Sequence, residues 1–283
     1  MSESVFLSVV IPTYHRNDLL ALCLDRLAPT LQSLSSSSYE VIVTDDGIKE
    51  TAQAMIQEQY PWAKWVAGPQ KGPAANRNNG AKHAQGNWLV FTDDDCLPEV
   101  MWLLSYFEGV VKNPNIQVFE GKTICKLGLK SPLEISPINE MGGLLWSCNF
   151  AIKNKIFSQL QGFNTNFPFA HMEDVEFRER IHLNNISCLF LENALIDHPP
   201  RKLNNGLYLA KHHESEFFYD VILHKKNYKL FTNGLIKKIF VFRVSVIIHR
   251  HISFDTIKAL ISLLIELPFT YIYIRKWVKK YNL

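Results

Sequence analysis

Three adjacent carboxylates, Asp93-Asp94-Asp95, form the sharpest chemical signal in the sequence. They directly follow residues 88–92 (WLVFT), a short apolar run typical of a buried strand. Neighbouring carboxylates repel one another, so folding should disfavour the triplet unless a cation offsets the charge. A hard divalent cation held by one or two carboxylates is the usual solution. The alternatives are a solvated turn, or carboxylates that cap a helix around Pro98.

The elements that must position these carboxylates alternate between strand and helix. Short runs rich in Val and Ile predict buried strands, and the stretches between them have the apolar pattern of helices. The predicted strands are residues 5–11, 40–44, 64–67 and 88–92, and the predicted helices are residues 17–34, 74–84 and 99–111. Strands that alternate with helices form a parallel sheet with right-handed crossovers. We therefore predict a doubly wound α/β domain.

Polar clusters follow three of these strands. Ligands of doubly wound sheets bind beyond the carboxyl ends of the strands, so these places matter most for function. The clusters are Pro12-Thr13-Tyr14, Asp45-Asp46-Gly47 and Asp93-Asp94-Asp95. Two of the three clusters are acidic. Because Asp45-Asp46 is expected at the same edge as the triplet, it strengthens the prediction of a metal site there. Further strands are predicted at residues 117–124, 147–152 and 187–191, and further helices at residues 174–183 and 207–224.

The net charge is unevenly distributed along the chain. Residues 1–200 hold 15 Lys/Arg and 22 Asp/Glu (net −7), whereas residues 201–283 hold 15 and 5 (net +10). A basic tail should face something anionic, and its long apolar runs suit lipid or protein better than nucleic acid. The five cysteines show no paired spacing, so we expect no zinc site and a reducing compartment. The first apolar run lacks a basic flank and ends at Pro12, so we expect no signal peptide.

Four motifs, in order, give the sequence a family resemblance. They are SVVIPTYHR, VIVTDDG, KGPAANRNNGAKHAQGNWLVFTDDDCLP and MEDVEFRERI. Over about residues 5–200 they resemble the inverting glycosyltransferases of family 2, which have a GT-A fold. The resemblance implies a mostly parallel sheet flanked by helices over residues 1–204, with a nucleotide-binding half (1–114) and an acceptor-binding half (115–204). Residues 205–283 would be a helical, basic and apolar extension and a candidate membrane-surface anchor.

The same resemblance implies how a nucleoside diphosphate sugar would be bound. Asp46 would accept a hydrogen bond from the base, which favours uracil or thymine. Asp95 would bind Mn²⁺ or Mg²⁺, and His198 would reach the metal or the diphosphate. The other implied donor contacts are Pro12, Thr13, Tyr14, Arg16, Gly72, Arg77, Asp93 and Asp94. The alternatives are a purely structural ion pair for Arg77 and a structural role for His198.

The resemblance also implies an acceptor side with a catalytic base. An acceptor hydroxyl is a poor nucleophile, so a carboxylate must take its proton, and Asp174 matches that base. Glu173 would lie beside the acceptor, and Trp146 would stack on a sugar ring. The alternatives treat Glu173 and Asp174 as first-turn acids that favour the helix dipole, and Trp146 as a core residue.

These expectations combine into one function. The chain would transfer a sugar from a UDP-sugar, or a dTDP-sugar, to a hydroxyl of a saccharide or lipid-linked saccharide, with inversion, in polysaccharide or glycoconjugate biosynthesis. It would be cytoplasmic and peripheral at the inner face of the cell membrane, although the tail could instead cover the sheet or form a dimer. A nucleotidyltransferase should carry a Gly-rich loop where this chain has PTYHR. A non-catalytic sugar-nucleotide-binding protein should have lost Asp95 or Asp174, and both are present.

Overall fold

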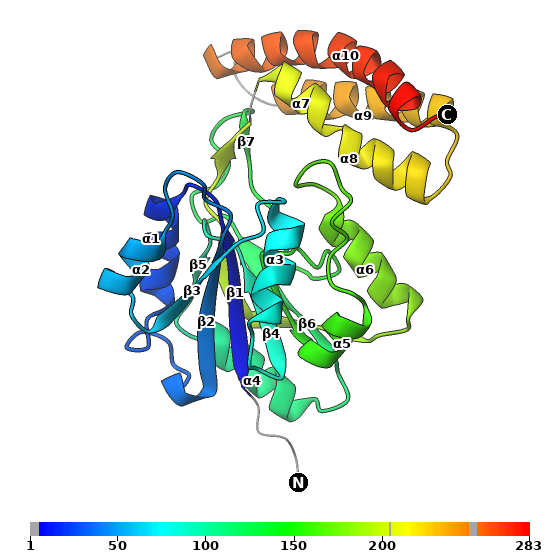
Figure 1. Cartoon of the computed structure of the whole chain (residues 1–283). Helices are drawn as coiled ribbons and strands as arrows, with labels where there is room; N and C mark the ends of the chain where they lie inside the picture. Colours follow the sequence, from blue (N-terminus) through cyan, green and yellow to red (C-terminus); the bar gives the residue numbers. More distant parts are fainter. Residues whose placement is uncertain (1–5, 204, 249–253) are drawn as a thin grey trace. The chain divides into compact units, whose positions relative to one another are not determined.

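The computed structural model describes residues 6–203, 205–248 and 254–283. The chain divides into two compact units (Figure 1). The first unit holds the large sheet and consists of the chain up to Lys126, then Pro137–Thr165 and Glu173–Pro199. The second unit is mostly helical and consists of Leu127–Ser136, Asn166–Met172 and the chain from Pro200 on. Two short segments within the sequence of the first unit therefore belong to the helical unit.

An eight-stranded sheet is the centre of the first unit, with the strand order β3-β2-β1-β4-β8-β6-β9-β5. Its strands are β1 (Leu7–Thr13), β2 (Tyr39–Asp45), β3 (Ala63–Ala67), β4 (Trp88–Thr92), β5 (Leu97–Pro98), β6 (Val118–Ile124), β8 (Asn149–Lys153) and β9 (Cys188–Asp197). β1 to β4 pair in parallel, and so do β6 and β9. Only β8 and β5 run antiparallel to their neighbours. This arrangement confirms the predicted doubly wound, mostly parallel fold.

Helices cover both faces of this sheet. They are α1 (Asn17–Leu27), α2 (Gln53–Gln59), α3 (Pro73–Lys82), α4 (Trp102–Lys112), α5 (Asn154–Gln159) and α6 (Glu173–Leu183). Successive residues of a strand point to opposite faces. Val9 and Ile11 of β1 accordingly join a core cluster with α1, α2 and α4, whereas Val10 joins a second cluster with α3, α5 and α6. The central strands β1, β2 and β4 are buried on both faces, which explains their continuous apolar runs.

Several predicted boundaries differ from the observed ones. The helix predicted over residues 17–34 ends at Leu27, because Ala28 precedes Pro29 and takes an extended conformation with ψ 136°. The helix predicted from residue 99 begins at Trp102, and β9 continues to Asp197 instead of ending at residue 191. The short helices α2 and α5 were not predicted, since seven and six residues carry too little apolar periodicity.

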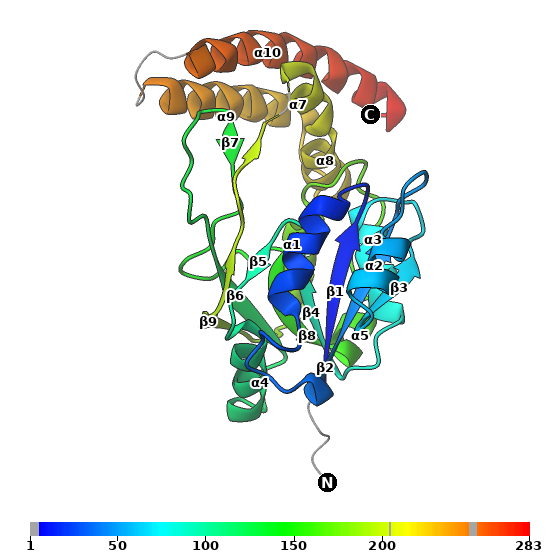
Figure 2. The same ribbon diagram turned by 90° about the vertical axis from the view of Figure 1, so that its left-hand side faces the viewer.

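The second unit contains α7 (Gly206–His212), α8 (Glu214–Phe217), the π-helical turn η2 (Phe218–Leu223), α9 (Tyr228–Ile248) and α10 (Phe254–Lys280). β7 (Glu134–Ile135) and β10 (Arg201–Lys202) add a short antiparallel ladder. α9 and α10 lie side by side (Figures 1 and 2), and their inner faces share an apolar cluster around Phe217 and Trp277. The buried Glu266 of α10 lies 2.9 Å from Nε2 of His213. The helical extension predicted for the C-terminal part is present, and its boundary at residue 204 stays a prediction.

The segment Asn166–Met172 is tied to α8 of the helical unit. Ser215 Oγ accepts a hydrogen bond from the Phe169 N–H (3.2 Å) and donates one to the Phe169 carbonyl (3.1 Å). His171 Nε2 lies 3.2 Å from a carboxylate oxygen of Glu216. The chain then passes through Met172, whose φ of 77° is uncommon for a residue with a side chain, and enters α6 of the first unit. The first residues of α6 therefore directly follow a segment that the helical unit holds.

Candidate active site

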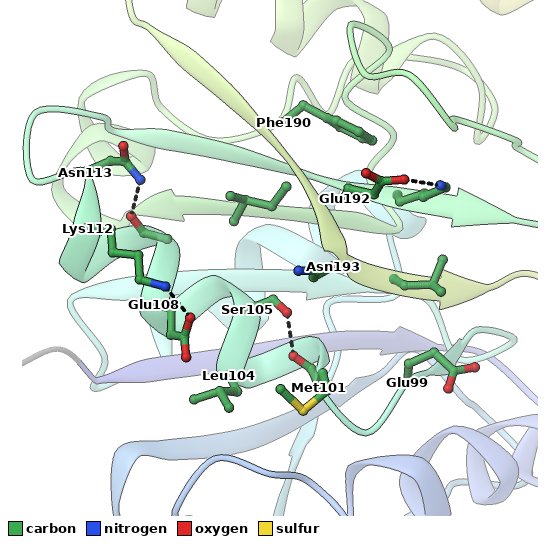
Figure 3. Close-up of a pocket in the computed structure, with 14 residues that line it drawn as sticks. Glu99, Met101, Leu104, Ser105, Glu108, Lys112, Asn113, Phe190, Glu192 and Asn193 are labelled. Carbon is green, nitrogen blue, oxygen red and sulfur yellow. Dashed lines mark hydrogen bonds and ion pairs between the residues drawn. The ribbon is translucent and has the colours of Figure 1, made fainter.

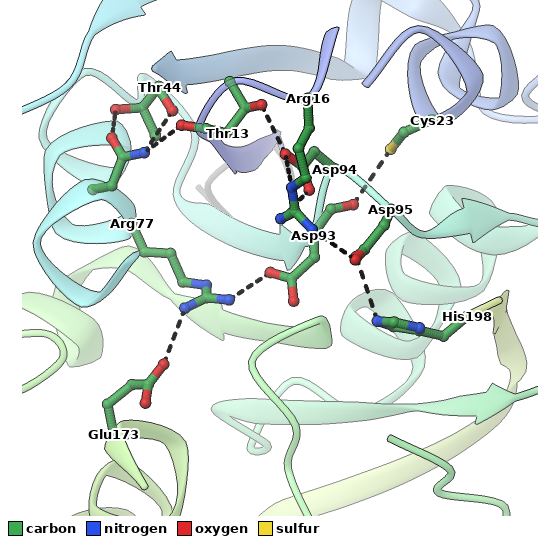
Figure 4. A network of polar contacts seen from close by, with 11 residues as sticks. Thr13, Arg16, Cys23, Thr44, Arg77, Asp93, Asp94, Asp95, Glu173 and His198 are labelled. Atoms are coloured by element: carbon green, nitrogen blue, oxygen red, sulfur yellow. Dashed lines mark hydrogen bonds and ion pairs between the residues drawn. The ribbon is translucent and has the colours of Figure 1, made fainter. Parts of the chain in front are cut away.

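The carboxyl ends of β1, β2 and β4 bring the three predicted polar clusters to one edge of the sheet. Asp46 donates its backbone N–H to the Thr13 carbonyl (3.0 Å), which joins the ends of β2 and β1. The Thr13 hydroxyl donates to Asp94 (2.7 Å), which joins the ends of β1 and β4 (Figure 4). Because these strands are parallel and adjacent, residues 33 and 81 positions apart in sequence become direct neighbours.

Arg16 forms ion pairs with the last two carboxylates of the triplet. Its guanidinium lies 2.5 Å from Asp94 Oδ1 and 2.9 Å from Asp95 Oδ2. The Asp94 side chain is fully buried, whereas that of Arg16 is 42% exposed. Burial raises the pKa of Asp94 to about 7, although Arg16 opposes this shift. The burial cost outweighs the ion pair because the partially solvated arginine offsets only part of the desolvation of Asp94.

Arg77 of α3 joins the first carboxylate of the triplet to the first residue of α6. It lies 2.5 Å from Asp93 Oδ1 and 3.4 Å from Glu173 Oε1 (Figure 4). Only 5% of the Arg77 side chain is exposed. Burial alone would raise the pKa of Asp93, but Arg77 holds it below its ordinary value. Glu173, predicted beside the acceptor, thus directs one carboxylate oxygen to the buried arginine of this network.

Asp95 and His198 face each other in a way that suits a bound cation. His198 Nδ1 lies 3.0 Å from the Pro199 carbonyl, which can only accept, so Nδ1 carries a proton. In a neutral ring, Nε2 then points its lone pair at Asp95 Oδ1, 3.4 Å away. Two acceptors at this distance require a second proton or a cation between them. The donor atoms of Asp95, Cys96 and His198 lie within 4.8 Å of one another, which fits one metal ion.

The acidic pair after β2 divides into two environments. Asp45 accepts hydrogen bonds from the backbone N–H groups of Gly47 (2.7 Å) and Ala52 (2.6 Å), so it organises its own loop. Asp46 accepts from the N–H groups of Gln70 (2.8 Å) and Gly72 (3.1 Å). Burial raises the pKa of Asp46 above its ordinary value, although these N–H groups oppose the shift. Asp46 is therefore bound to the loop after β3, which contains the predicted donor residue Gly72.

The other predicted residues lie on the same unit with different exposure. Pro12 is buried within β1, and Tyr14 is 54% exposed just after this strand. Trp146 is partly buried, and its Nε1–H donates to the Ile138 carbonyl (3.2 Å). Asp174 is partly exposed in the first turn of α6, where its carboxylate accepts from the Val175 N–H (2.8 Å).

Asn76 is a site residue that the sequence reasoning missed. Its side-chain amide donates to the carbonyls of Thr44 (2.8 Å) and Thr13 (3.3 Å) and accepts from the Thr44 hydroxyl (2.6 Å). It therefore fixes α3 against the ends of β1 and β2. The available signal was its place in the motif KGPAANRNNG, one residue before Arg77.

A groove of about 720 Å³ lies elsewhere in the first unit, between α4 and β9 (Figure 3). Four of its charged residues pair with one another: Lys112 with Glu108 (2.6 Å) and Lys122 with Glu192 (2.8 Å). None of the residues predicted to do chemistry lines it. The groove therefore does not compete with the carboxylate edge as the active site.

Comparison with known proteins identifies the family. The model of the family described as "Glycosyl transferase family 2" matches residues 8–160, which is more than half of the chain. The chain belongs to glycosyltransferase family 2. It is similar to an uncharacterized glycosyltransferase of Haemophilus influenzae, with 29% identity over 189 residues, or 60% of each chain. It is also similar to the GalNAc(5)-diNAcBac-PP-undecaprenol beta-1,3-glucosyltransferase of Campylobacter jejuni, with 30% identity over 94 residues, or 31% of this chain and 29% of that protein.

These matches span less than two thirds of the length of either relative. Solved structures share the fold of this glycosyltransferase. S. aureus TarS 1-349 in complex with UDP-GlcNAc superposes with a TM-score of 0.57 and 16% identity, over 96% of this chain and 92% of that one. The mannosyltransferase PcManGT of Pyrobaculum calidifontis, in complex with GDP-Man and Mn²⁺, gives 0.54 and 17%, over 99% and 76%. The likeness confirms the GT-A fold.

Replacing Arg77 with methionine should destabilise this glycosyltransferase. The substitution keeps the length of the side chain but leaves Asp93 and Glu173 without its charge. Loss of one partner from a buried ion pair lowers the free energy of unfolding by about 3 kcal/mol or more. The matched control is Lys82→Met, an exposed cation on the same helix, which should change stability by less than about 0.5 kcal/mol. Denaturant unfolding measures both, and equal stability of the two variants would contradict a stabilising role for Arg77.

Proposed function

We propose that this family 2 member transfers a sugar from a UDP-sugar, with dTDP-sugars as the second choice, to a hydroxyl of a saccharide or lipid-linked saccharide. The observation that carries the proposal is the sheet edge where the ends of β1, β2 and β4 are joined through Thr13 and where Asp95 faces His198. The carboxylate of Asp174 acts electrostatically on Arg77, which binds Asp93 at this edge. A uracil or thymine base has an N–H group that can donate a hydrogen bond to the carboxylate of Asp46. Solved structures of the same fold carry UDP-GlcNAc or GDP-Man, which supports a nucleoside diphosphate sugar as the donor.

The donor would lie against the loops that follow β1, β2 and β3. These loops and the end of β4 contain, or are supported by, the predicted donor residues Pro12, Thr13, Tyr14, Arg16, Gly72, Arg77, Asp93 and Asp94. The exposed ring of Tyr14 offers a flat face to a base, and Arg16 and Arg77 keep Asp93 and Asp94 compensated. The pocket would therefore bind a diphosphate without leaving its own buried carboxylates unpaired.

Asp95 and His198 would hold the divalent cation, Mn²⁺ or Mg²⁺. A carboxylate oxygen suits either ion, and the imidazole nitrogen of His198 favours Mn²⁺ as the softer of the two. When bound, the cation would stabilise the negative charge on the departing diphosphate. The proton on His198 Nδ1 orients the ring so that Nε2 faces the cation position.

Asp174 would act as the base of the reaction. Its carboxylate takes the proton of the acceptor hydroxyl while the hydroxyl oxygen forms a bond to C1 of the sugar. The bond between C1 and the diphosphate oxygen breaks, and its electron pair leaves with the nucleoside diphosphate. Attack from the face opposite the leaving group inverts the anomeric centre. Trp146 would stack on the acceptor sugar, and Glu173 would brace the acceptor side through Arg77.

Calorimetric titration with UDP, dTDP, GDP and CDP, each with and without Mn²⁺, tests the donor site. We expect Mn²⁺-dependent binding of UDP or dTDP and at least about a hundredfold weaker binding by Asp95→Ala, because the variant lacks the carboxylate ligand. Asp18→Ala, which removes an exposed acid of α1, is the control and should bind as the wild type does. Unchanged Mn²⁺-dependent binding by Asp95→Ala would remove Asp95 from the metal site.

Asp174→Asn separates binding from catalysis. The amide keeps the shape of the side chain but cannot take a proton, so UDP affinity should stay within about twofold while transfer falls by about a hundredfold or more. Glu58→Gln, on the exposed face of α2, is the control. The measurement is release of nucleoside diphosphate with a panel of para-nitrophenyl glycosides as acceptors. Turnover retained by Asp174→Asn would assign the base elsewhere, and a wild type that binds donor without turnover would favour the non-catalytic alternative.

The helical unit would attach the enzyme to an anionic membrane surface, which would place it at the inner face of the cell membrane. Among the described residues, the helix Asp255–Lys280 is long enough to cross a membrane and contains an 18-residue window with a mean hydropathy of 1.6. One face of this helix is packed and carries the buried Glu266, and its opposite face exposes the apolar side chains of Ile257, Ile261 and Leu264. Exposed Arg275, Lys276 and Lys279 follow on the same helix. An apolar face with adjacent cations suits a helix that lies in the lipid interface.

Sedimentation with lipid vesicles tests this attachment. The protein should sediment with vesicles of phosphatidylcholine and phosphatidylglycerol and much less with phosphatidylcholine alone, because the cations need anionic headgroups. The double variant Ile261→Glu/Leu264→Glu should reduce sedimentation by about tenfold or more. Val111→Glu, which adds a charge to an exposed apolar position of α4, is the control. If the wild type stays in the supernatant with both vesicle types, the proposed attachment to membranes is wrong.

A further inference from the structure

The loop of residues 139–146 combines an exposed surface with a constrained backbone. Met141 is 90% exposed, and Leu144 is also exposed. Three of its residues adopt left-handed conformations, with φ of 79° at Gly142, 90° at Gly143 and 44° at Leu145. A Cβ at position 142 would lie about 3 Å from the Phe190 side chain, so only glycine fits there. A backbone of this kind needs contacts from outside the loop to keep its shape.

The first of these contacts is the buried carboxylate of Glu120. This β6 residue is 2% exposed, and its carboxylate accepts four hydrogen bonds. Two come from the N–H groups of Gly143 (2.6 Å) and Leu144 (2.8 Å). The others come from the Leu145 N–H and the side-chain amide of Asn139 (2.7 Å). Oε1 receives three of these bonds and Oε2 receives one, and hydrogen bonds to a charged acceptor are stronger than those between neutral groups.

The second contact is Arg178 of α6. Its guanidinium donates to the carbonyls of Gly143 (3.1 Å) and Leu144 (2.8 Å). The peptide groups of these two residues are therefore held on both sides, with N–H bound to Glu120 and C=O bound to Arg178. Arg178 follows Asp174 by four residues, so the two side chains lie on the same face of α6. The loop is thus bonded to the helix that carries the proposed base.

We propose that Glu120 and Arg178 are positioning residues that hold the loop of residues 139–146 in the shape that receives the acceptor. The inference rests on the proposed function, in which Trp146 at the end of this loop contacts the acceptor sugar. The exposed side chains of the loop supply the contact surface, and its peptide groups are fixed before the acceptor arrives. Such preorganisation lowers the cost of binding because little order remains to be gained. In this proposal both residues act through the loop and not by contact with the substrates.

Hydrogen exchange of the intact protein, without any ligand, tests whether Glu120 and Arg178 hold the loop. The amides of residues 143–145 should exchange slowly in the wild type, although the loop is exposed, because they donate to Glu120. Glu120→Gln replaces one acceptor oxygen with an NH₂ group, so protection of these amides should fall by about tenfold or more. Arg178→Met should lower it as well, and Arg178→Lys should restore part of it. The controls are Glu108→Gln and Arg26→Met, both at exposed positions of the first unit. Protection equal to the wild type in both test variants would overturn the proposal.

Acceptor kinetics test whether the loop held by Glu120 and Arg178 binds the acceptor. With the para-nitrophenyl glycoside that the wild type uses best, both test variants should raise the acceptor KM by about tenfold or more. Affinity for UDP should stay within about twofold, because the residues proposed to bind the donor follow β1, β2, β3 and β4 and do not belong to this loop. Lost protection with an unchanged acceptor KM would refute the acceptor role. If Glu120→Gln does not fold, Arg178→Met and its lysine rescue decide.

A wild type that transfers sugar to no glycoside would end the proposed function and the acceptor role with it. The exchange measurement would still show whether Glu120 and Arg178 hold the loop. The two failures are therefore distinguishable.

Discussion

Repulsion among the carboxylates at the end of β4 is the constraint around which the first unit is built. Asp93, Asp94 and Asp95 lie one after another at an edge where little of their side chains meets water. The side chains that contact them come from three distant parts of the chain: Arg16 after β1, Arg77 in α3 and His198 after β9. The two arginines offset part of the negative charge, and they do so only when these parts meet at the sheet edge. The ion pairs of the site therefore depend on the order of the strands in the sheet.

Neighbouring carboxylates acquire different properties because successive side chains point in different directions. Asp94 is fully buried against Thr13 and Arg16, and burial raises its pKa to about 7. Asp93, one residue earlier, has its pKa held below the ordinary value by Arg77, against the effect of burial. Asp45 and Asp46 divide in the same way between two backbone loops. The geometry of each partner, and not the residue type, decides what a carboxylate can do.

The sequence was a good guide to the strands and to the edge where chemistry would occur. Strands β1 to β4 are predictable because buried parallel strands need continuous β-branched and apolar runs, and the polar clusters mark their ends. The end of α1 required attention to Ala28 ahead of Pro29, and the short α2 and α5 have too few turns to be recognised. Glu120 could not be found, since a lone acid in FEGKT gives no sign that its partners come from residues 139–145. The pairing of Glu173 with Arg77 was equally hidden by a separation of 96 residues.

The first helix turns of α6 connect the two sides of the site. Glu173 bonds to Arg77 and through it to Asp93, which anchors the helix on the side of the carboxylate triplet. Arg178 bonds to the carbonyls of Gly143 and Leu144, which anchors the same helix to the loop of residues 139–146. Asp174 lies between these anchors, one residue after the first and four before the second. Contacts on both sides of Asp174 restrain the first turns of α6, so the same helix that contacts the carboxylate triplet through Arg77 also contacts the loop through Arg178.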